Sequence, residues 1–442
     1  MIRLLSTNVY KVAAFADFRK GDLTRTIRRS NQTDGGRTAQ DRFAPALSMT
    51  TSDPIISSQR QWLAVSSLSV ASFSLVTAEF LPVGLLAGMA ADLGVSTGTA
   101  GLAVAVPALI AAVSAPCLTI FAAKRDRRSI LLLLTALLAA SSVMSMYAPT
   151  WLFFLAARIL FGIALGGFWA IGASLPQRIM APDAVGKATS LIYIGVSIGI
   201  VIGVPAGTLI GQSLGWRAAF AVCSGTALLA LLFQWLVLPR TAGSSNLTVR
   251  DLIRLLSKPA TMMALSITTL AIGAQFATYT FVEPFLRQVA GADTSFVALT
   301  LVAYGVAGIV GSIAGGIGVD RSLLTTLMIV LFTSAATLAL LSAIGNNDVV
   351  AMSIISLWGI AFGALPLCLQ LWNARLAHPQ VEAGAALFVG VLQASIAIGS
   401  AAGGLVVDHL GVRANMIVGT LCFVLTCGLA FFARRGSMLT AH

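Results

Sequence analysis

Residues 158–182, RILFGIALGGFWAIGASLPQRIMAP, give the strongest indication of the fold because a related segment occurs again in the second half of the chain. The segment ISLWGIAFGALPLCLQLWNARLAHP, residues 355–379, aligns with it at a constant shift of 197 positions. One span later the shift is 196, where Leu-Gly-x-Arg ends once at Arg217 and once at Arg413. Two related halves are typical of transporters that bind their substrate between the halves, near the membrane midplane. The coinciding residues are Gly162 and Gly359, Gly166 and Gly363, Arg178 and Arg375, Pro182 and Pro379, Gly203 and Gly399, and Gly207 and Gly403.

Both copies lie in a chain that is too apolar to remain in water. Of its 442 residues, 57% are hydrophobic and only 10% are charged, whereas soluble domains carry about 25% charged residues. A bilayer core about 30 Å thick requires about 20 apolar residues per helical span. The apolar runs are long and continuous rather than alternating, which excludes a membrane β-barrel. Twelve spans meet the length criterion, near residues 62–86, 99–121, 129–147, 151–176, 186–210, 217–238, 260–286, 295–318, 323–343, 349–372, 383–406 and 414–433.

These patterns predict an all-α membrane protein with twelve transmembrane helices in two six-helix repeats. Residues 1–60 are polar and arginine-rich and are expected to form a disordered cytoplasmic tail, within which Met49 is a candidate for the true start. Residues 61–238 are expected to form the N-terminal half. A cytoplasmic central loop over residues 239–259 separates it from the C-terminal half, residues 260–442.

The distribution of charge predicts the orientation. The net charge is +12, which could suggest nucleic-acid binding, but 24 of the 28 lysines and arginines fall on one side of the predicted spans. An excess of basic residues marks the cytoplasmic side, so both termini are expected in the cytoplasm. No nucleic-acid partner is expected. The five cysteines and three histidines show no metal-ligand spacing, so we expect neither metal nor cofactor.

The predicted fifth span carries a glycine at every fourth position, in GVSIGIVIGVPAGTLIG, residues 195–211. This spacing places the glycines on one helix face and lets another helix backbone approach closely. Pro205 removes one backbone hydrogen bond and bends the helix. The pattern indicates tight packing, and it is also compatible with a hinge or seal at the domain interface formed by Gly199, Gly203, Pro205 and Gly207.

An Asp-Arg pair occurs at two related cytoplasmic junctions. Asp126 and Arg127 follow the second predicted span, and Asp320 and Arg321 follow the eighth. Such residues can cap helix ends and form ion pairs that latch the cytoplasmic side until it opens. Positive charge that sets topology alone explains them equally well.

Glu79, Arg158 and Glu283 are the ionisable residues predicted to lie at membrane depth. Charges in the hydrocarbon are costly and are functional candidates by default. Glu79 and Arg158 both lie about seven residues from the outer ends of their spans, roughly 10 Å deep at about 1.5 Å per residue, so the two side chains can form an ion pair. Burial favours the protonated carboxyl and a nearby guanidinium favours the carboxylate, so movement of Arg158 could switch proton binding. A static pair is the alternative. Glu283 is expected to be interfacial.

Polar and aromatic side chains also recur at mid-depth. Each alone is more consistent with core packing, but together they offer stacking faces and amide groups that suit a flat heterocycle. The candidate substrate-binding residues are Phe168, Trp169, Gln275, Tyr279, Trp358 and Gln393, with Tyr304 nearby.

The segments TAEFLPVGLL (residues 77–86), GVPAGTLIGQSLGWRAAF (residues 203–220) and QFATYTF (residues 275–281) resemble the drug:proton antiporter branch of the major facilitator superfamily, and within it the bacterial purine ribonucleoside efflux pumps. The resemblance covers nearly everything from Met49 onward and implies the major facilitator fold and proton-driven export. Arg158 and Gly162 match the family's fourth-helix motif, and Gly199, Gly203, Pro205 and Gly207 its fifth-helix motif.

The chain departs from the family pattern where Ala122 and Ala123 replace glycines of the loop motif, at Val204, and at Glu283. The resulting prediction is a monomeric, proton-coupled antiporter that exports purine ribonucleosides or similar small polar solutes. A sugar or multidrug exporter of the same superfamily is the alternative. A membrane-embedded enzyme would need a nucleophile with its base, or a metal cluster, at membrane depth, and the sequence offers neither. A non-transporting receptor is disfavoured by the paired halves.

Overall fold

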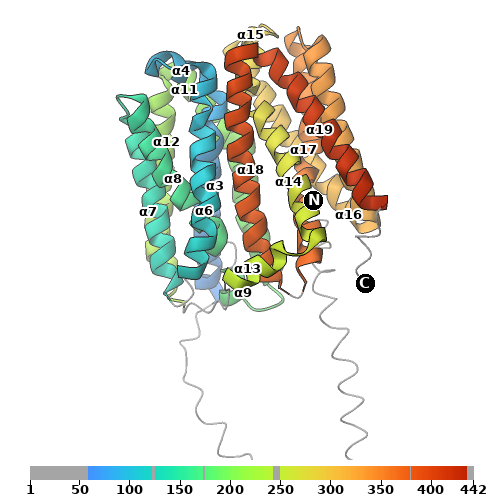
Figure 1. Ribbon diagram of the computed structural model, residues 1–442. Coiled ribbons are helices and arrows are strands. Elements are labelled where there is room, and N and C mark those ends of the chain that lie inside the picture. The colour runs from blue at the N-terminus through green and yellow to red at the C-terminus, as the bar shows by residue number, and fades with distance from the viewer. Residues whose placement is uncertain (1–57, 122–124, 173–174, 242–248, 379, 436–442) are drawn as a thin grey trace, which may run out of the picture.

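The computed structural model describes residues 58–121, 125–172, 175–241, 249–378 and 380–435. The predicted tail, residues 1–57, lies outside this part, and the first helix begins at Ser58. All regular structure in the described ranges is helical (Figure 1). The N-terminal half comprises α3 (Ser58–Phe80), η2 (Leu81–Gly84), α4 (Leu86–Leu93), α5 (Thr97–Ala100), α6 (Leu102–Phe121), α7 (Arg127–Met146), α8 (Trp151–Ile171), α9 (Pro176–Ile179), α10 (Val185–Ile198), η5 (Gly199–Gly203), α11 (Val204–Leu214) and α12 (Trp216–Val237).

The C-terminal half follows the predicted central loop, which contains the short helix α13 (Val249–Leu256). Its elements are α14 (Pro259–Tyr279), α15 (Val282–Gln288), α16 (Thr294–Ile344), α17 (Asp348–Ala377), α18 (Val381–Leu410) and α19 (Val412–Arg435). In Figure 1, α9 and α13 lie at the lower end of the bundle and α4 and α15 at the upper end. We call these two ends the α9/α13 face and the α4/α15 face.

Among the described residues, eleven helices are long and apolar enough to cross a membrane, and α16 crosses it twice. Its 51 residues would extend about 75 Å as one straight helix, against a core of about 30 Å. The backbone is non-helical at Ser322 (φ −161°, ψ 107°), and a Cβ on Gly318 would lie 2.7 Å from the Thr326 hydroxyl. The chain therefore reverses at Ser322, which separates the two spans predicted near 295–318 and 323–343.

Twelve crossings place the start of α3 and the end of α19 on the same face of the bundle. Because α4 follows α3, α3 runs from the α9/α13 face to the α4/α15 face (Figure 1). The glycines of the two Leu-Gly-x-Arg motifs explain why those turns are alike. Gly215 and Gly411 adopt φ values of 89° and 86°, a conformation that residues with a Cβ rarely take, and each ends one span just before the next begins.

The internal repeat is confirmed by matching contacts in the two halves. Gly203 packs on Thr77 and Gly207 on Leu81, while Gly399 packs on Gly273 and Gly403 on Ala277. Every residue of the second set is 196 positions after its counterpart in the first. Likewise Gly162 packs on Pro107 and Gly166 on Ala111, while Gly359 packs on Tyr304 and Gly363 on Gly308, all at a shift of 197. The two halves therefore share helix pairs as well as sequence.

The glycine face of the fifth span packs inside the N-terminal half rather than at the interface between halves. A Cβ on Gly195 or Gly203 would collide with Ser69 or Thr77 of α3. The predicted tight packing of this face is therefore observed against α3, and a hinge or seal formed by Gly199, Gly203, Pro205 and Gly207 stays a prediction. The span is bent where Pro205 cannot donate to a backbone carbonyl, and the preceding residues form the π-helical turn η5. Next to this turn, Gly305 of α16 contacts Val201 across the two halves.

Candidate functional site

Four of the residues predicted to bind substrate or to lie near it meet in the C-terminal half. Gln275 and Tyr279 lie one turn apart on α14. The Gln275 amide donates to the Tyr304 hydroxyl (2.9 Å) and accepts from the Trp358 indole (2.9 Å). The Tyr279 and Tyr304 rings stack with centroids 4.8 Å apart. All four side chains are buried, so three helices, α14, α16 and α17, hold one polar aromatic cluster.

Three phenylalanines that the sequence analysis missed extend this cluster. Phe362, one turn after Trp358, stacks on Tyr304 at 5.8 Å. Phe276 stacks on Phe80 at 5.9 Å. Phe80 belongs to α3 of the N-terminal half, so the cluster reaches the interface between the halves. Their positions beside Glu79 and Gln275, and one turn after Trp358, were the sequence signal that could have identified them. Phenylalanine is abundant, however, and the orientation of each ring depends on the packing of the helices.

The cluster is closed in this conformation. Both polar atoms of the Gln275 amide are already occupied, so Gln275 positions the rings of Tyr304 and Trp358. A centroid distance of 4.8 Å is direct ring contact, which leaves no gap for a ligand between Tyr279 and Tyr304. Phe80 and Phe362 are only partly buried. A planar ligand would therefore stack on these two rings.

Glu79 lies beside this cluster and faces the opposite half. Its carboxyl group lies close to the side chain of Gln393 on α18, and both side chains are buried. The residue after Glu79 is Phe80, the N-terminal member of the aromatic cluster. The structure therefore brings a carboxyl group, an amide and several aromatic rings together where the two halves meet.

Arg158 is fully buried but is not paired with Glu79. Its guanidinium donates to the Ala78 carbonyl (3.1 Å) and to the Ser145 hydroxyl (3.3 Å). The rings of Phe154, Phe161 and Phe220 surround it, with centroids 4.8–5.3 Å from Cζ. The prediction of equal depth is consistent with the contact to Ala78, the neighbour of Glu79. The ion pair with Glu79 is absent from this conformation because the guanidinium points to the backbone.

Phe168 and Trp169 lie elsewhere in the N-terminal half. Phe168 is buried in the hydrophobic core of that half, and the Trp169 ring contacts Tyr193 at 6.2 Å. The ring contacts found in the described part of the chain do not join either residue to the cluster around Tyr279. Gly166 and Gly167, which precede these residues in the sequence, pack α8 against α6 and α7.

Asp126 links the start of α7 to the segment that follows α12. It caps α7 by accepting from the Arg128 amide (3.3 Å) and also accepts from the Thr241 amide (3.0 Å). Burial raises the pKa of Asp126, but the hydrogen bonds from Thr241, Ser129 and Arg128 outweigh it and lower the pKa overall. These contacts are within the N-terminal half, and Arg127 is buried beside them. Asp320 and Arg321 lie at the reversal of α16, just before Ser322.

Glu283 is buried in the protein, with 1% of its surface exposed. It forms an ion pair with Arg287 one turn later on α15 and accepts from the Ala87 amide of α4 (3.2 Å). Burial raises the pKa of Glu283, more than the charge and hydrogen bond of Arg287 lower it. Although α15 lies at one end of the bundle (Figure 1), α4 covers Glu283, so its carboxyl group is buried in protein.

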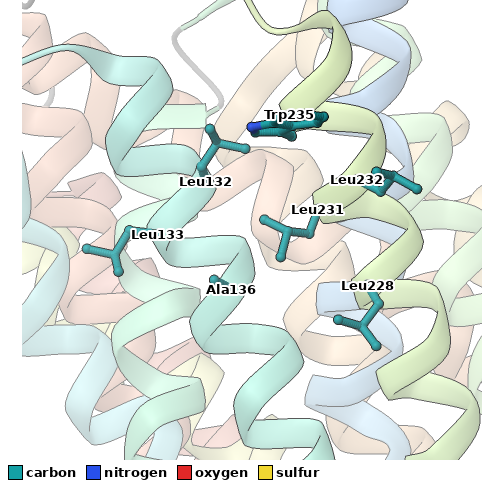
Figure 2. A pocket seen from close by; sticks show the side chains of 7 residues that line it. All are labelled: Leu132, Leu133, Ala136, Leu228, Leu231, Leu232 and Trp235. Carbon is teal, nitrogen blue, oxygen red and sulfur yellow. The ribbon is translucent and has the colours of Figure 1, made fainter.

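The open groove shown in Figure 2 is a different feature. It lies between α7 and α12 and is lined by six aliphatic side chains and Trp235. Leu133, Leu228 and Leu232 on it are exposed, as expected for a surface that faces lipid. Apart from the indole nitrogen of Trp235, the side chains that line it carry no polar group to orient a solute. Within the described ranges, no group of three or more His, Cys, Asp or Glu residues is placed to hold a metal ion.

Comparison with known proteins agrees with this architecture. The Major Facilitator Superfamily profile matches residues 68–392. The purine ribonucleoside efflux pump NepI of Escherichia coli is 32% identical over 365 residues, which covers 83% of this chain and 92% of that protein. The protein named transcription regulatory protein OpdE of Pseudomonas aeruginosa is 32% identical over 380 residues, covering 85% and 94%.

Solved structures share the fold. The nucleoside transporter NupG superposes with a TM-score of 0.70 at 16% identity, covering 84% of this chain and 99% of that one. A bacterial homologue of the human lysosomal transporter Spinster superposes with a TM-score of 0.68 at 15% identity, covering 88% and 98%. With its profile match, its twelve crossings and its repeated halves, the chain belongs to the Major Facilitator Superfamily and is a multi-pass membrane transporter.

Proposed function

We propose that this transporter exports purine ribonucleosides, or similar small polar solutes, in exchange for protons. The observation that carries the proposal is the meeting of Glu79, Gln393 and the ring cluster at the junction of the two halves. Relatives named as purine ribonucleoside efflux pumps, at 32–34% identity, support the same substrate class.

The chemistry of the site suits a nucleoside. A purine base can stack on the partly exposed rings of Phe80 and Phe362, since aromatic side chains stack on any base. Ribose hydroxyls are donors, and a carboxylate accepts such bonds strongly. Glu79 would bind the ribose as a carboxylate, while the Gln393 amide can donate to or accept from the sugar. Transport by alternating access requires such groups at the interface between halves.

Glu79 is also our candidate for the proton carrier. Its carboxyl group faces an amide rather than a cation in this conformation, which leaves protonation open. Arg158 holds the carbonyl of Ala78, the preceding residue. A shift of α3 relative to α8 would change the distance between Arg158 and Glu79 and so favour one protonation state. Substrate and proton would then compete for Glu79, which is the requirement for exchange.

The proposed setting is a bacterial inner membrane, with the α9/α13 face and both chain ends in the cytoplasm. Arg178 of α9, Lys187 near the start of α10, and Arg254 of α13 lie on this face and are exposed. The opposite face carries Arg217, Arg287 and Arg413, so the excess of positive charge is on the α9/α13 face. We propose that the protein acts as a monomer, because the substrate groups come from both halves of one chain.

The decisive experiment is uptake into everted membrane vesicles, across a panel of purine nucleosides, sugars and cationic drugs, with and without a proton gradient. We expect gradient-dependent uptake of inosine and adenosine. Uptake of sugars or drugs instead would favour the alternative exporter. No flux of any solute would contradict transport and would favour a regulatory role, as the name of OpdE suggests for that relative.

A matched pair of variants tests the site itself. Phe362→Leu removes a ring from the cluster, and we expect it to raise the KM for a nucleoside about tenfold, since stacking on a base is worth about 1–3 kcal/mol. Phe332→Leu removes an exposed ring from α16 and should leave the KM unchanged. The measurement is nucleoside uptake by purified protein in liposomes. Equal effects of the two variants would remove the cluster from the substrate site.

A further inference from the structure

Two carboxylates of the C-terminal half hold the N-terminal half at the α4/α15 face. The first is Glu283 of α15, which accepts a hydrogen bond from the Ala87 amide of α4 at 3.2 Å. Its other oxygen is paired with Arg287, which also donates to the Thr294 hydroxyl at the start of α16 (3.3 Å). Glu283 is therefore anchored within its own half while it binds a backbone group of the other.

The second carboxylate is Asp408, near the end of α18. It accepts from the Ser96 hydroxyl (2.5 Å) and from the Gly98 amide (2.7 Å), both of which precede α6. The backbones touch at the same place, because a Cβ on Gly404 of α18 would collide with the Gly98 carbonyl. Ser96, which also binds Thr99, is held in position to donate to Asp408.

A third carboxylate on this face behaves differently and serves as a reference. Asp92 of α4 accepts from the Trp216 indole (3.0 Å) and is paired with Arg217 of α12. These partners belong to its own half. Hydrogen bonds from Arg217 and Trp216 lower the pKa of Asp92. These contacts do not cross between the halves, so separation of the halves leaves them intact.

We propose that Glu283 and Asp408 are positioning residues of the transport cycle, a clasp that closes the α4/α15 face and must be released before the substrate site opens toward it. The donors on the N-terminal half include two backbone amides, so the carboxylates are the parts of the clasp that substitution can remove. When the halves separate, water takes over these hydrogen bonds, so the clasp is reversible. This inference rests on the proposed transport function.

The test measures the distance between halves without any substrate. Spin labels are placed on cysteines at Ala91 of α4 and Gln288 of α15, both exposed, in a chain whose five native cysteines are replaced by alanine. The distance distribution is measured by double electron–electron resonance in liposomes. We expect one short distance for the parent protein. Asp408→Ala combined with Glu283→Gln should increase the population of longer distances about fivefold, the ratio that corresponds to the typical net contribution of one hydrogen bond.

Matched variants separate the clasp from general damage. Asp92→Ala, on the same face but bonded within one half, should leave the distribution unchanged. Asp408→Asn keeps one acceptor oxygen and should give an intermediate shift. Asp408 is exposed, so Asp408→Ala alone carries the test if the double variant fails to fold. The proposal is overturned if Asp408→Ala matches Asp92→Ala, or if the parent protein lacks the short distance. A clear shift together with no nucleoside flux would instead overturn the proposed function and leave the clasp standing.

Discussion

Among single residues, Glu79 provides the most direct test of how proton movement is coupled to transport. Glu79→Gln preserves the shape of the side chain and its contact with Gln393, but the amide cannot bind or release a proton near neutral pH. We expect it to abolish proton-driven accumulation and to leave substrate exchange at least partly intact.

The measurement for Glu79 is proton release when substrate is added to purified protein, followed with a pH-indicator dye. Asp92→Asn is the control variant, because Asp92 lies near the end of α4 and its carboxylate is paired with Arg217. Proton release by Glu79→Gln with parental stoichiometry would show that Glu79 is not the carrier. Glu283 would then be the next candidate.

Arg158 tests the importance of a buried guanidinium. Its two terminal nitrogens bind different groups, Ala78 and Ser145, and lysine cannot reproduce this planar fork. We expect Arg158→Lys to lose transport and to lower the free energy of unfolding by about 1.5–3 kcal/mol, the range for a hydrogen bond to a charged group. Thermal unfolding and flux measure the two effects. Arg217→Lys, at a half-exposed ion pair, should cost less than about 1 kcal/mol, and a similar loss at both positions would argue against a special role for Arg158.

At the scale of helices, the contact between α3 and the span α10–α11 controls the shape of the N-terminal half. Gly203→Leu and Gly207→Leu place a branched side chain against Thr77 and Leu81, where even a Cβ collides. We expect both variants to impair transport and to reduce the yield of monodisperse protein in detergent, because overpacking costs about 1–3 kcal/mol. Gly225→Leu on α12 is the control, since a Cβ there meets no atom within 4 Å. Normal flux and yield for Gly203→Leu would contradict the packing described here.

At the scale of the whole molecule, the helical bundle begins at Ser58, and the preceding residues show no apolar periodicity that could add a span. We expect a chain that starts at Met49 to insert and to transport at the parental rate. Membrane fractionation and nucleoside uptake check this. Failure of the shortened chain to insert, with the full chain as the control, would show that residues 1–48 are required.

The sequence alone determined the number of spans, their order and the pairing of the two halves. These features depend on the length of apolar runs and on the spacing of matching residues, which are local or additive properties of a chain in a bilayer. Even the reversal at Ser322 was predictable, because a single helix of 51 residues is too long for the membrane. Gln275, Tyr279, Tyr304 and Trp358 were likewise identified from their type and depth, although their mutual contacts were not.

Only the tertiary structure decided which way each helix face turns. The spans are apolar on nearly all sides, so periodicity does not distinguish a face toward lipid from a face toward another helix. The rotation of each helix is set by glycine contacts with helices distant in the sequence, such as Gly203 on Thr77 and Gly399 on Gly273. For this reason Arg158 binds a backbone carbonyl rather than Glu79, Glu79 meets Gln393, and Glu283 is buried against α4.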